Sequence, residues 1–135
     1  MPSQYRQMRF EAVRESAMRR RYDPHIEAIN RLVDELREEG QAQIPYVDAC
    51  LGGVNSQVLF LFQDPGPGTD HTEHGCGFLS PQNDDPSAEC FLQCLHDSGL
   101  DLNYVIAWNA YPWRFHPRVE LRARHLTKGL EPLRP

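Results

Sequence analysis

The feature that most constrains the fold is an uninterrupted apolar run, Val58-Leu-Phe-Leu-Phe62, with a polar segment directly after it. An apolar run without alternation is typical of a parallel strand that is buried on both faces. We therefore predict a central strand over residues 57–62. Residues 63–87 are rich in Gly, Pro, Asp, Asn and His. A loop of that length inside a compact domain is usually functional.

A second apolar segment, residues 103–108, predicts another strand, and Asn109 follows it directly. Helix signals lie before and between the strands. Asp-Pro pairs at 23–24 and 85–86 favour helix starts, and glycines at 40 and 99 favour helix ends. A further helix is expected within residues 3–21, and another helical pattern begins at Arg118. Strand–helix–strand units form parallel sheets, so the predicted class is α/β.

The chain has 135 residues, which is the usual size of one domain. We expect residues 1–22 to form an N-terminal helical extension and residues 23–135 to form the α/β domain. No run of 18 apolar residues exists, and residues 1–6 lack the apolar stretch of a secretory signal. We therefore expect a cytoplasmic protein with no membrane partner.

Charge is distributed unevenly along the chain. Residues 38–113 contain no Lys or Arg but contain eleven Asp and Glu, while both ends carry net positive charge. Binding to nucleic acid depends mainly on basic side chains that neutralise phosphates. Any contact with DNA through charge must therefore come from the two ends of the chain rather than from its middle.

Four cysteines occur, and Cys90 and Cys94 lie one helical turn apart. This spacing differs from the C-x2-C pairs of structural zinc sites, so reduced, buried thiols are the preferred interpretation. A zinc site made by His71, Glu73, His74 and Cys76 is a weaker alternative. We expect no metal and no organic cofactor.

Two polar segments follow the two predicted strands. Gln63-Asp64-Pro65-Gly66 follows the first, and Asn109 follows the second. Ligands of open α/β sheets bind at the carboxyl ends of the strands, where these segments can converge. A carboxylate there can orient water or stabilise a developing cation, and a carboxamide suits the edge of a base. A simple turn at Asp64-Pro65 is the alternative.

Three segments in this order resemble motifs of the uracil-DNA glycosylase superfamily. They are Gln63-Asp64-Pro65, Gly75-Cys-Gly-Phe-Leu-Ser80 and Val105-Ile-Ala-Trp-Asn-Ala110. The resemblance covers residues 23–135. It implies a three-layer α/β/α fold around a short parallel sheet. It also implies a base-excision DNA repair hydrolase that needs no cofactor and cleaves the N-glycosidic bond of a flipped uracil or related base.

The resemblance also implies a role for each matching residue. Asp64 is expected to position the water and stabilise the sugar cation, Phe78 to stack on the base, and Asn109 to read the pyrimidine edge. Substrate binding is implied for three further residues: Gln63, through its backbone amide, Pro65 and Gly66. The partner is DNA that contains uracil or a damaged base, and no obligate protein partner is expected.

The sequence departs from the family pattern at several points. Gly66 stands where the best-known branch has a tyrosine that excludes the methyl group of thymine, and Phe62 replaces the usual glycine. No segment matches the family's late histidine loop, and His116 and His125 lie in other contexts. Two later strands are also not recognisable. We therefore expect a truncated chain with an incomplete sheet that self-associates. The alternatives are a non-catalytic nucleobase- or DNA-binding member of the superfamily, and a metal- or partner-binding domain that shares only the fold.

Overall fold

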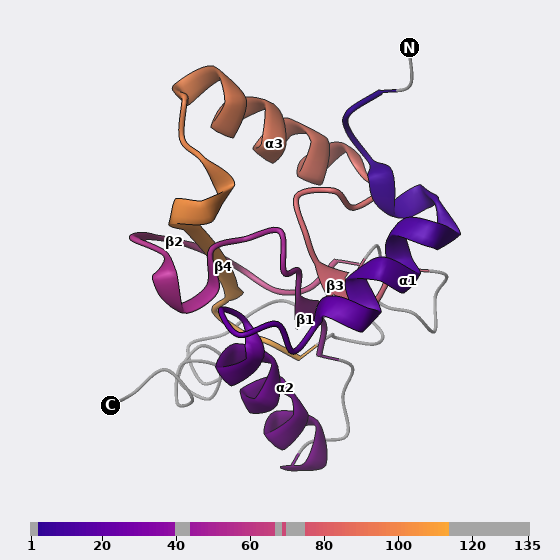
Figure 1. Ribbon diagram of the computed structural model, residues 1–135, viewed down its shortest axis with the longest axis vertical. Helices are drawn as coiled ribbons and strands as arrows, with labels where there is room; N and C mark the ends of the chain where they lie inside the picture. Colours follow the sequence, from indigo (N-terminus) through magenta and orange to yellow (C-terminus); the bar gives the residue numbers. More distant parts are fainter. Residues whose placement is uncertain (1–2, 40–43, 67–68, 70–74, 114–135) are drawn as a thin grey trace.

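The computed structural model describes residues 3–39, 44–66, 69 and 75–113, and the structural statements below concern these residues. They form a mixed α/β fold in which three α-helices accompany two small parallel sheets (Figure 1). The helices and strands are α1 (Glu11–Arg20), α2 (Glu27–Glu39), β1 (Tyr46–Val47), β2 (Val58–Phe62), β3 (Phe78–Leu79), α3 (Pro86–Ser98) and β4 (Val105–Asn109). Three short 3-10 helices are η1 (Gln7–Arg9), η2 (Gly53–Asn55) and η5 (Leu102–Tyr104).

The two strands predicted from the apolar runs are present and pair with each other. β2 and β4 are parallel, with Val58 opposite Val105 and Phe62 opposite Asn109. Asn109 is the last residue of β4 rather than the first residue after it. The α/β class and the parallel strand pairing predicted from the sequence are therefore confirmed.

The exposure of β2 differs from the prediction that both of its faces are buried. Leu59 is 52% exposed and Leu61 is 50% exposed. On the other face, Phe60 and Phe62 place their rings 5.0 and 5.2 Å from the ring of Phe91 in α3. Among the described strands only β4 pairs with β2, so one edge and one face of this apolar strand remain open.

The second sheet joins two segments that the sequence predicts to be loops, namely residues 41–56, which close with Gly52-Gly53, and residues 63–87. β1 and β3 are parallel and only two residues long. The buried side chain of Asn30 in α2 hydrogen-bonds to the backbone of β1. Its carboxamide accepts from Val47 N at 2.8 Å and donates to Val47 O at 3.0 Å. Tyr46 also donates to Asp34 of α2 at 2.6 Å. A helix side chain thus satisfies backbone groups that a neighbouring strand would otherwise satisfy.

The predicted helix signals at Asp85 and Gly99 set the ends of α3. Asp85 accepts from Ala88 N at 2.8 Å as the N-cap, and Gly99 adopts a φ of 72° after the last turn. The other predicted start differs, since α2 begins at Glu27, three residues beyond Pro24. There the carboxylate of Asp23 pairs with Arg20 at 3.0 Å.

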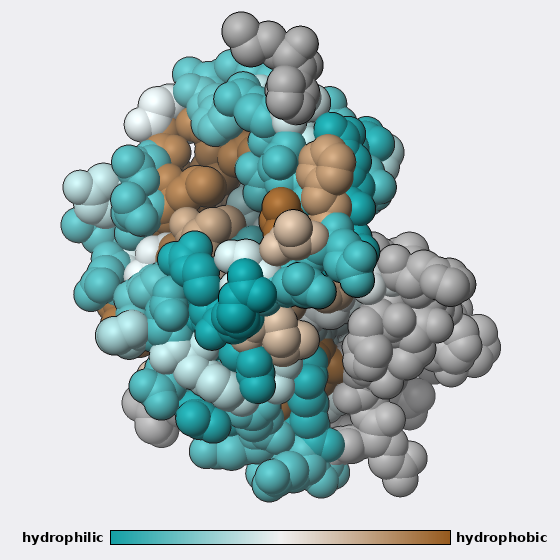
Figure 2. All heavy atoms as spheres, turned by 45° about the vertical axis from the view of Figure 1, so that its right-hand side comes forward, coloured by the Kyte–Doolittle hydropathy of each residue, from teal (hydrophilic) through white to brown (hydrophobic). Residues whose placement is uncertain are grey.

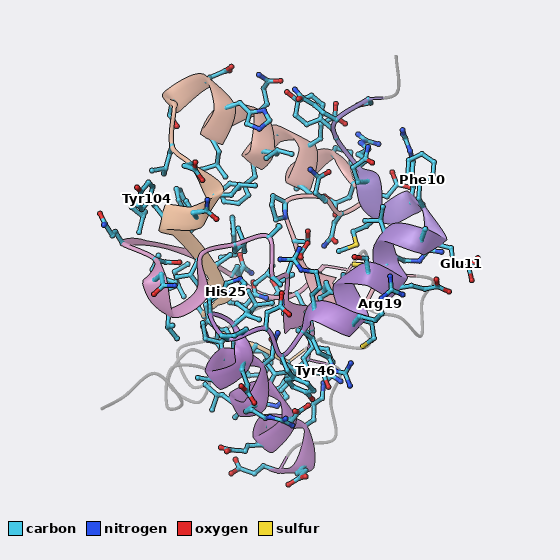
Figure 3. The ribbon with its side chains drawn as sticks, viewed as in Figure 1. Phe10, Glu11, Arg19, His25, Tyr46 and Tyr104 are labelled. Atoms are coloured by element: carbon cyan, nitrogen blue, oxygen red, sulfur yellow. The ribbon has the colours of Figure 1, made fainter. Side chains whose placement is uncertain are left out.

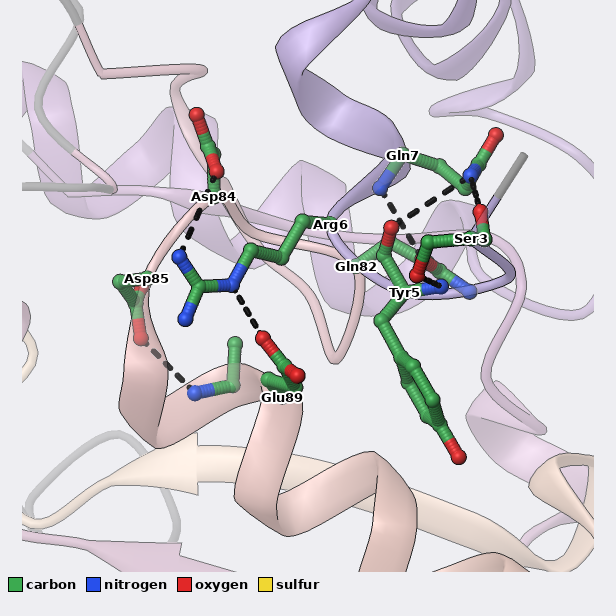
Figure 4. Close-up of polar contacts among 9 residues, drawn as sticks. Ser3, Tyr5, Arg6, Gln7, Gln82, Asp84, Asp85 and Glu89 are labelled. Carbon is green, nitrogen blue, oxygen red and sulfur yellow. Dashed lines mark hydrogen bonds and ion pairs between the residues drawn. The ribbon is translucent and has the colours of Figure 1, made fainter. Parts of the chain in front are cut away.

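The N-terminal segment packs against the loop that precedes α3 (Figure 4). Met8 is 3% exposed, and its N–H donates to Gln82 O at 2.9 Å. Gln7 N donates to the side chain of Gln82 at 3.2 Å, and Arg6, whose φ is 55°, pairs with Glu89. These contacts attach residues 3–9 to the α/β domain.

The outer surface is mixed in character. Figure 3 shows Phe10 and Glu11 at the end of α1 that lies away from the strands. On the face shown in Figure 2, apolar side chains lie in a hollowed area that hydrophilic side chains surround. In the described part of the chain, no helix has the length and apolar character needed to cross a bilayer.

Because Met8 is buried and lies beside Gln82, we expect Met8→Ala to lower the free energy of unfolding by about 2–3 kcal/mol. Met18→Ala is the matched control, since Met18 is 42% exposed. Its effect should stay below about 0.5 kcal/mol. Urea denaturation followed by circular dichroism measures both. Equal effects would show that the N-terminal segment is not part of the cooperative unit.

The open apolar edge of β2 leads us to expect self-association of this chain at micromolar concentration. Leu61→Lys adds a charge to the exposed face of that strand and should shift the chain toward the monomer in sedimentation velocity. Val54→Lys adds the same charge at a site that is 60% exposed but outside β2, and it should leave association unchanged. A monomeric, cooperatively melting unmodified chain would contradict the expectation.

Candidate functional site

The polar segments after β2 and β4 leave the sheet side by side. The parallel ladder continues beyond the strands, with Ala110 N donating to Phe62 O at 2.7 Å and Tyr111 N donating to Gln63 O at 3.0 Å. Backbone hydrogen bonds fix these two segments relative to each other. The convergence that the sequence predicts at the carboxyl ends of the strands therefore occurs.

A cavity of about 360 Å³ opens at this end of the sheet, between β2, β4 and the first turn of α3. Asp64, Pro65 and Gly66 line it from the first segment, and Asn109 lines it from β4. The volume lies within the range of small-molecule sites. Asn109 is only 3% exposed, so its carboxamide meets a ligand in a largely dry environment.

Phe78 is the one residue of the six predicted for the site that lies elsewhere. Gln63, predicted to act through its backbone amide, lies between the cavity-lining residues Phe62 and Asp64, with its side chain exposed. Phe78 is fully buried in β3, with its ring 5.9 Å from that of Tyr46, and it does not line the cavity. β3 pairs with β1 rather than with β2, which places Phe78 in the core beside α2.

The aromatic wall of the cavity is made by two other residues, Phe62 and Phe91. Their rings meet edge to face, with an interplanar angle of 89°. Apolar ring surfaces of this kind suit a flat, aromatic ligand. The sequence shows Phe62 only as a departure from the family pattern, and Phe91 only as one apolar residue on a helix face, so neither pattern predicts a role in the site.

A polar wall is made by Ser80 and Asn83, which the sequence also does not indicate as site residues. Both are buried, with 6% and 3% of their surface exposed. Asn83 donates to Phe78 O at 2.9 Å and accepts from the thiol of Cys76 at 2.8 Å. Ser80 donates to the carboxylate of Asp48 at 2.6 Å. The long loop predicted to be functional therefore supplies this wall.

The thiols of Cys50 and Cys76 near this wall are partly buried and held in the neutral form, whereas Cys90 and Cys94, which the sequence also predicts to be buried, are exposed. Burial raises the pKa of the Cys76 thiol to about 11. Burial, followed by the charge of Asp48, raises the pKa of the Cys50 thiol well above its ordinary value. Nucleophilic attack and metal binding both require the thiolate, so these pKa shifts suit a structural role.

The described residues contain no cluster of three His, Cys, Asp or Glu side chains that could hold a metal ion. Three members of the predicted zinc alternative, His71, Glu73 and His74, lie outside the described residues, as do His116 and His125. The predicted helical pattern after Arg118 also lies outside them.

Comparison of the chain with protein-family models, with curated proteins and with solved structures found no match in any of the three. A functional assignment therefore depends on the residues that line the cavity.

Gly66 offers a direct test of the space inside the cavity. A Cβ atom added at Gly66 meets no atom within 4 Å, and its φ is not positive. We expect Gly66→Ala to change the free energy of unfolding by less than about 0.5 kcal/mol. Gly52→Ala is the contrasting variant, because its Cβ would lie 2.0 Å from Asn103 O, and it should be strongly destabilising. Thermal melts compare the two, and similar losses would contradict the cavity geometry.

Proposed function

We propose that this chain is a uracil-DNA-glycosylase-like hydrolase that excises uracil or a related base from DNA. One observation carries the proposal: Asp64 and Asn109, from segments 45 residues apart, line one cavity at the carboxyl ends of paired parallel strands. The order in which the three motifs at residues 63–65, 75–80 and 105–110 follow one another supports the same reaction. We also propose that the chain has the three-layer α/β/α arrangement of that superfamily.

In the proposed reaction, the bond between the sugar and the base breaks while water attacks the sugar carbon. The transition state carries positive charge on the sugar, and the carboxylate of Asp64 would stabilise that charge. The same carboxylate would orient the attacking water and accept its proton. The electron pair of the broken bond leaves with the base, which departs as an anion and is then protonated.

Base recognition in this proposal falls to Asn109, whose carboxamide presents one acceptor and two donors in one plane. The amide can therefore pair with adjacent carbonyl and N–H groups on a pyrimidine edge. Phe62 and Phe91 would supply the apolar surface for the flipped ring, returning part of the cost of a few kcal/mol for flipping. Gly66 leaves space beside the base, which would admit substituents larger than hydrogen.

The proposed DNA partner requires positive charge near the cavity. Six of the eight Arg and Lys in the described residues lie between Arg6 and Arg21, and the middle of the chain has none. Phosphate contacts would therefore come from the N-terminal helix and its flanks, or from the six Arg and Lys of residues 114–135. A non-catalytic nucleobase- or DNA-binding protein with the same cavity is the alternative function.

Release of uracil from a labelled single-stranded oligonucleotide tests the proposal. We expect Asp64→Asn to lower the rate by about 10²-fold or more, because it removes the negative charge and the proton acceptor while preserving shape. Asp97→Asn, at an exposed position of α3, is the matched control and should retain full activity. Binding without release by the unmodified chain would support the alternative. Equal release by both variants would exclude Asp64 as the catalytic residue.

A further inference from the structure

Two thiols lie next to each other on the exposed face of α3, outside the cavity. Cys90 and Cys94 are both exposed, whereas Leu92 and Leu95 form the buried side of the same helix. Neither thiol lines the cavity. Free cysteine is among the most buried residue types, so two exposed cysteines on one helix need an explanation. The proposed hydrolase reaction gives them no role.

Helix geometry brings the two thiols together. Side chains four residues apart lie on the same face of an α-helix, with Cβ atoms about 5–6 Å apart. A hydrogen bond with the Cys90 side chain is the main cause that raises the pKa of the Cys94 thiol above its ordinary value. The two sulfur atoms therefore lie within hydrogen-bonding reach of each other, and solvent reaches both.

The spacing of this pair does not suit a direct disulfide. A disulfide brings its two Cβ atoms to about 3.5–4.5 Å, which is closer than the helix holds them. Forming one would distort α3, whose ends are fixed by the cap at Asp85 and the left-handed turn at Gly99. A metal–thiolate bond is about 2.3 Å long in zinc sites, so an ion of similar bond length joins sulfur atoms up to about 4.6 Å apart. The pair therefore suits a bridging ion better than an S–S bond.

The ligands available at the pair restrict the kind of ion. Within the described part of the chain, no third His, Cys, Asp or Glu completes a cluster with the two thiols. Asp97, one turn after Cys94, accepts from Gln93 at 2.7 Å. Structural zinc takes four ligands, and calcium and magnesium take oxygen ligands. Two thiolates alone suit Cu(I), a soft ion that thiolate ligands select.

We propose that Cys90 and Cys94 form a two-thiolate site for a soft, two-coordinate metal ion, Cu(I), on the outer face of α3. On binding, each S–H releases its proton to solvent and each sulfur forms one bond to the ion. No electron is transferred, and the complex carries one negative charge. This site goes beyond the proposed function and does not depend on it, because no residue of the cavity takes part.

Competition for Cu(I) between the full, reduced chain and the chromophoric chelator bathocuproine disulfonate, measured under argon, tests the proposal. We expect the chain to take one Cu(I). Cys94→Ser should lower the affinity by about 10²-fold or more, because the second bond is then no longer formed within the same helix. Cys94 is exposed, so the substitution should leave the fold intact. Unchanged affinity in Cys94→Ser would overturn the proposal.

A matched control separates the spacing of the thiols from their number. Cys94→Ser combined with Asp97→Cys keeps four cysteines in the chain but places the two of α3 seven residues apart, about 10 Å along the helix axis. One ion cannot join sulfur atoms at that spacing without unwinding the helix, so the affinity should stay as low as in Cys94→Ser. Recovery of full affinity in this double variant would overturn the proposal.

Zn(II) tests the inferred class of ion. With two thiolates and no further ligand, the unmodified chain should not retain a stoichiometric amount of Zn(II) through gel filtration. Retention of one Zn(II) per chain that disappears in Cys94→Ser would overturn the assignment to a two-coordinate ion.

Discussion

The parallel pairing of β2 with β4 is the constraint on which the cavity depends. Side chains alternate between the two faces of a strand, so the register decides which residues face α3. With Phe62 opposite Asn109, both residues line the cavity on the α3 side. A shift by one residue would turn one strand's set to the other face and remove either the aromatic ring or the carboxamide from the site.

This pairing leaves the two faces of β2 unequally covered. The strand is apolar at all five positions, yet α3 covers only the face that carries Phe60 and Phe62. Leu59 and Leu61 remain half exposed on the opposite face. The strand that carries the site therefore also leaves an apolar face half exposed.

Local signals in the sequence predict the elements that bring the site together. The apolar runs place β2 and β4 within two residues, and Asp85 with Gly99 sets both ends of α3 through a cap and a left-handed turn. The motifs at Asp64 and Asn109 converge because carboxyl ends of parallel strands share one edge. These features depend on residues that are close in sequence, or on the general rules of α/β sheets.

The remaining features depend on contacts that local patterns do not contain. β1 and β3 are two residues long, too short for any periodicity, and β1 pairs both with β3 and with the side chain of Asn30. Phe78 lies in the core because β3 pairs with β1, which no motif can indicate. The polar wall depends on Asp48, which lies 32 residues before Ser80 and belongs to a segment predicted to be a plain loop.

The attachment of residues 3–9 to the loop before α3 has a consequence for synthesis on the ribosome. Arg6 and Glu89 are 83 residues apart, and Gln7 and Gln82 are 75 residues apart. At a translation rate of about 5–20 residues per second, the N-terminal segment would wait roughly 4–15 s for its docking site to be made. During that interval the loop that Met8 contacts does not yet exist, so residues 3–9 reach their final place only after residues 82–89 have been made.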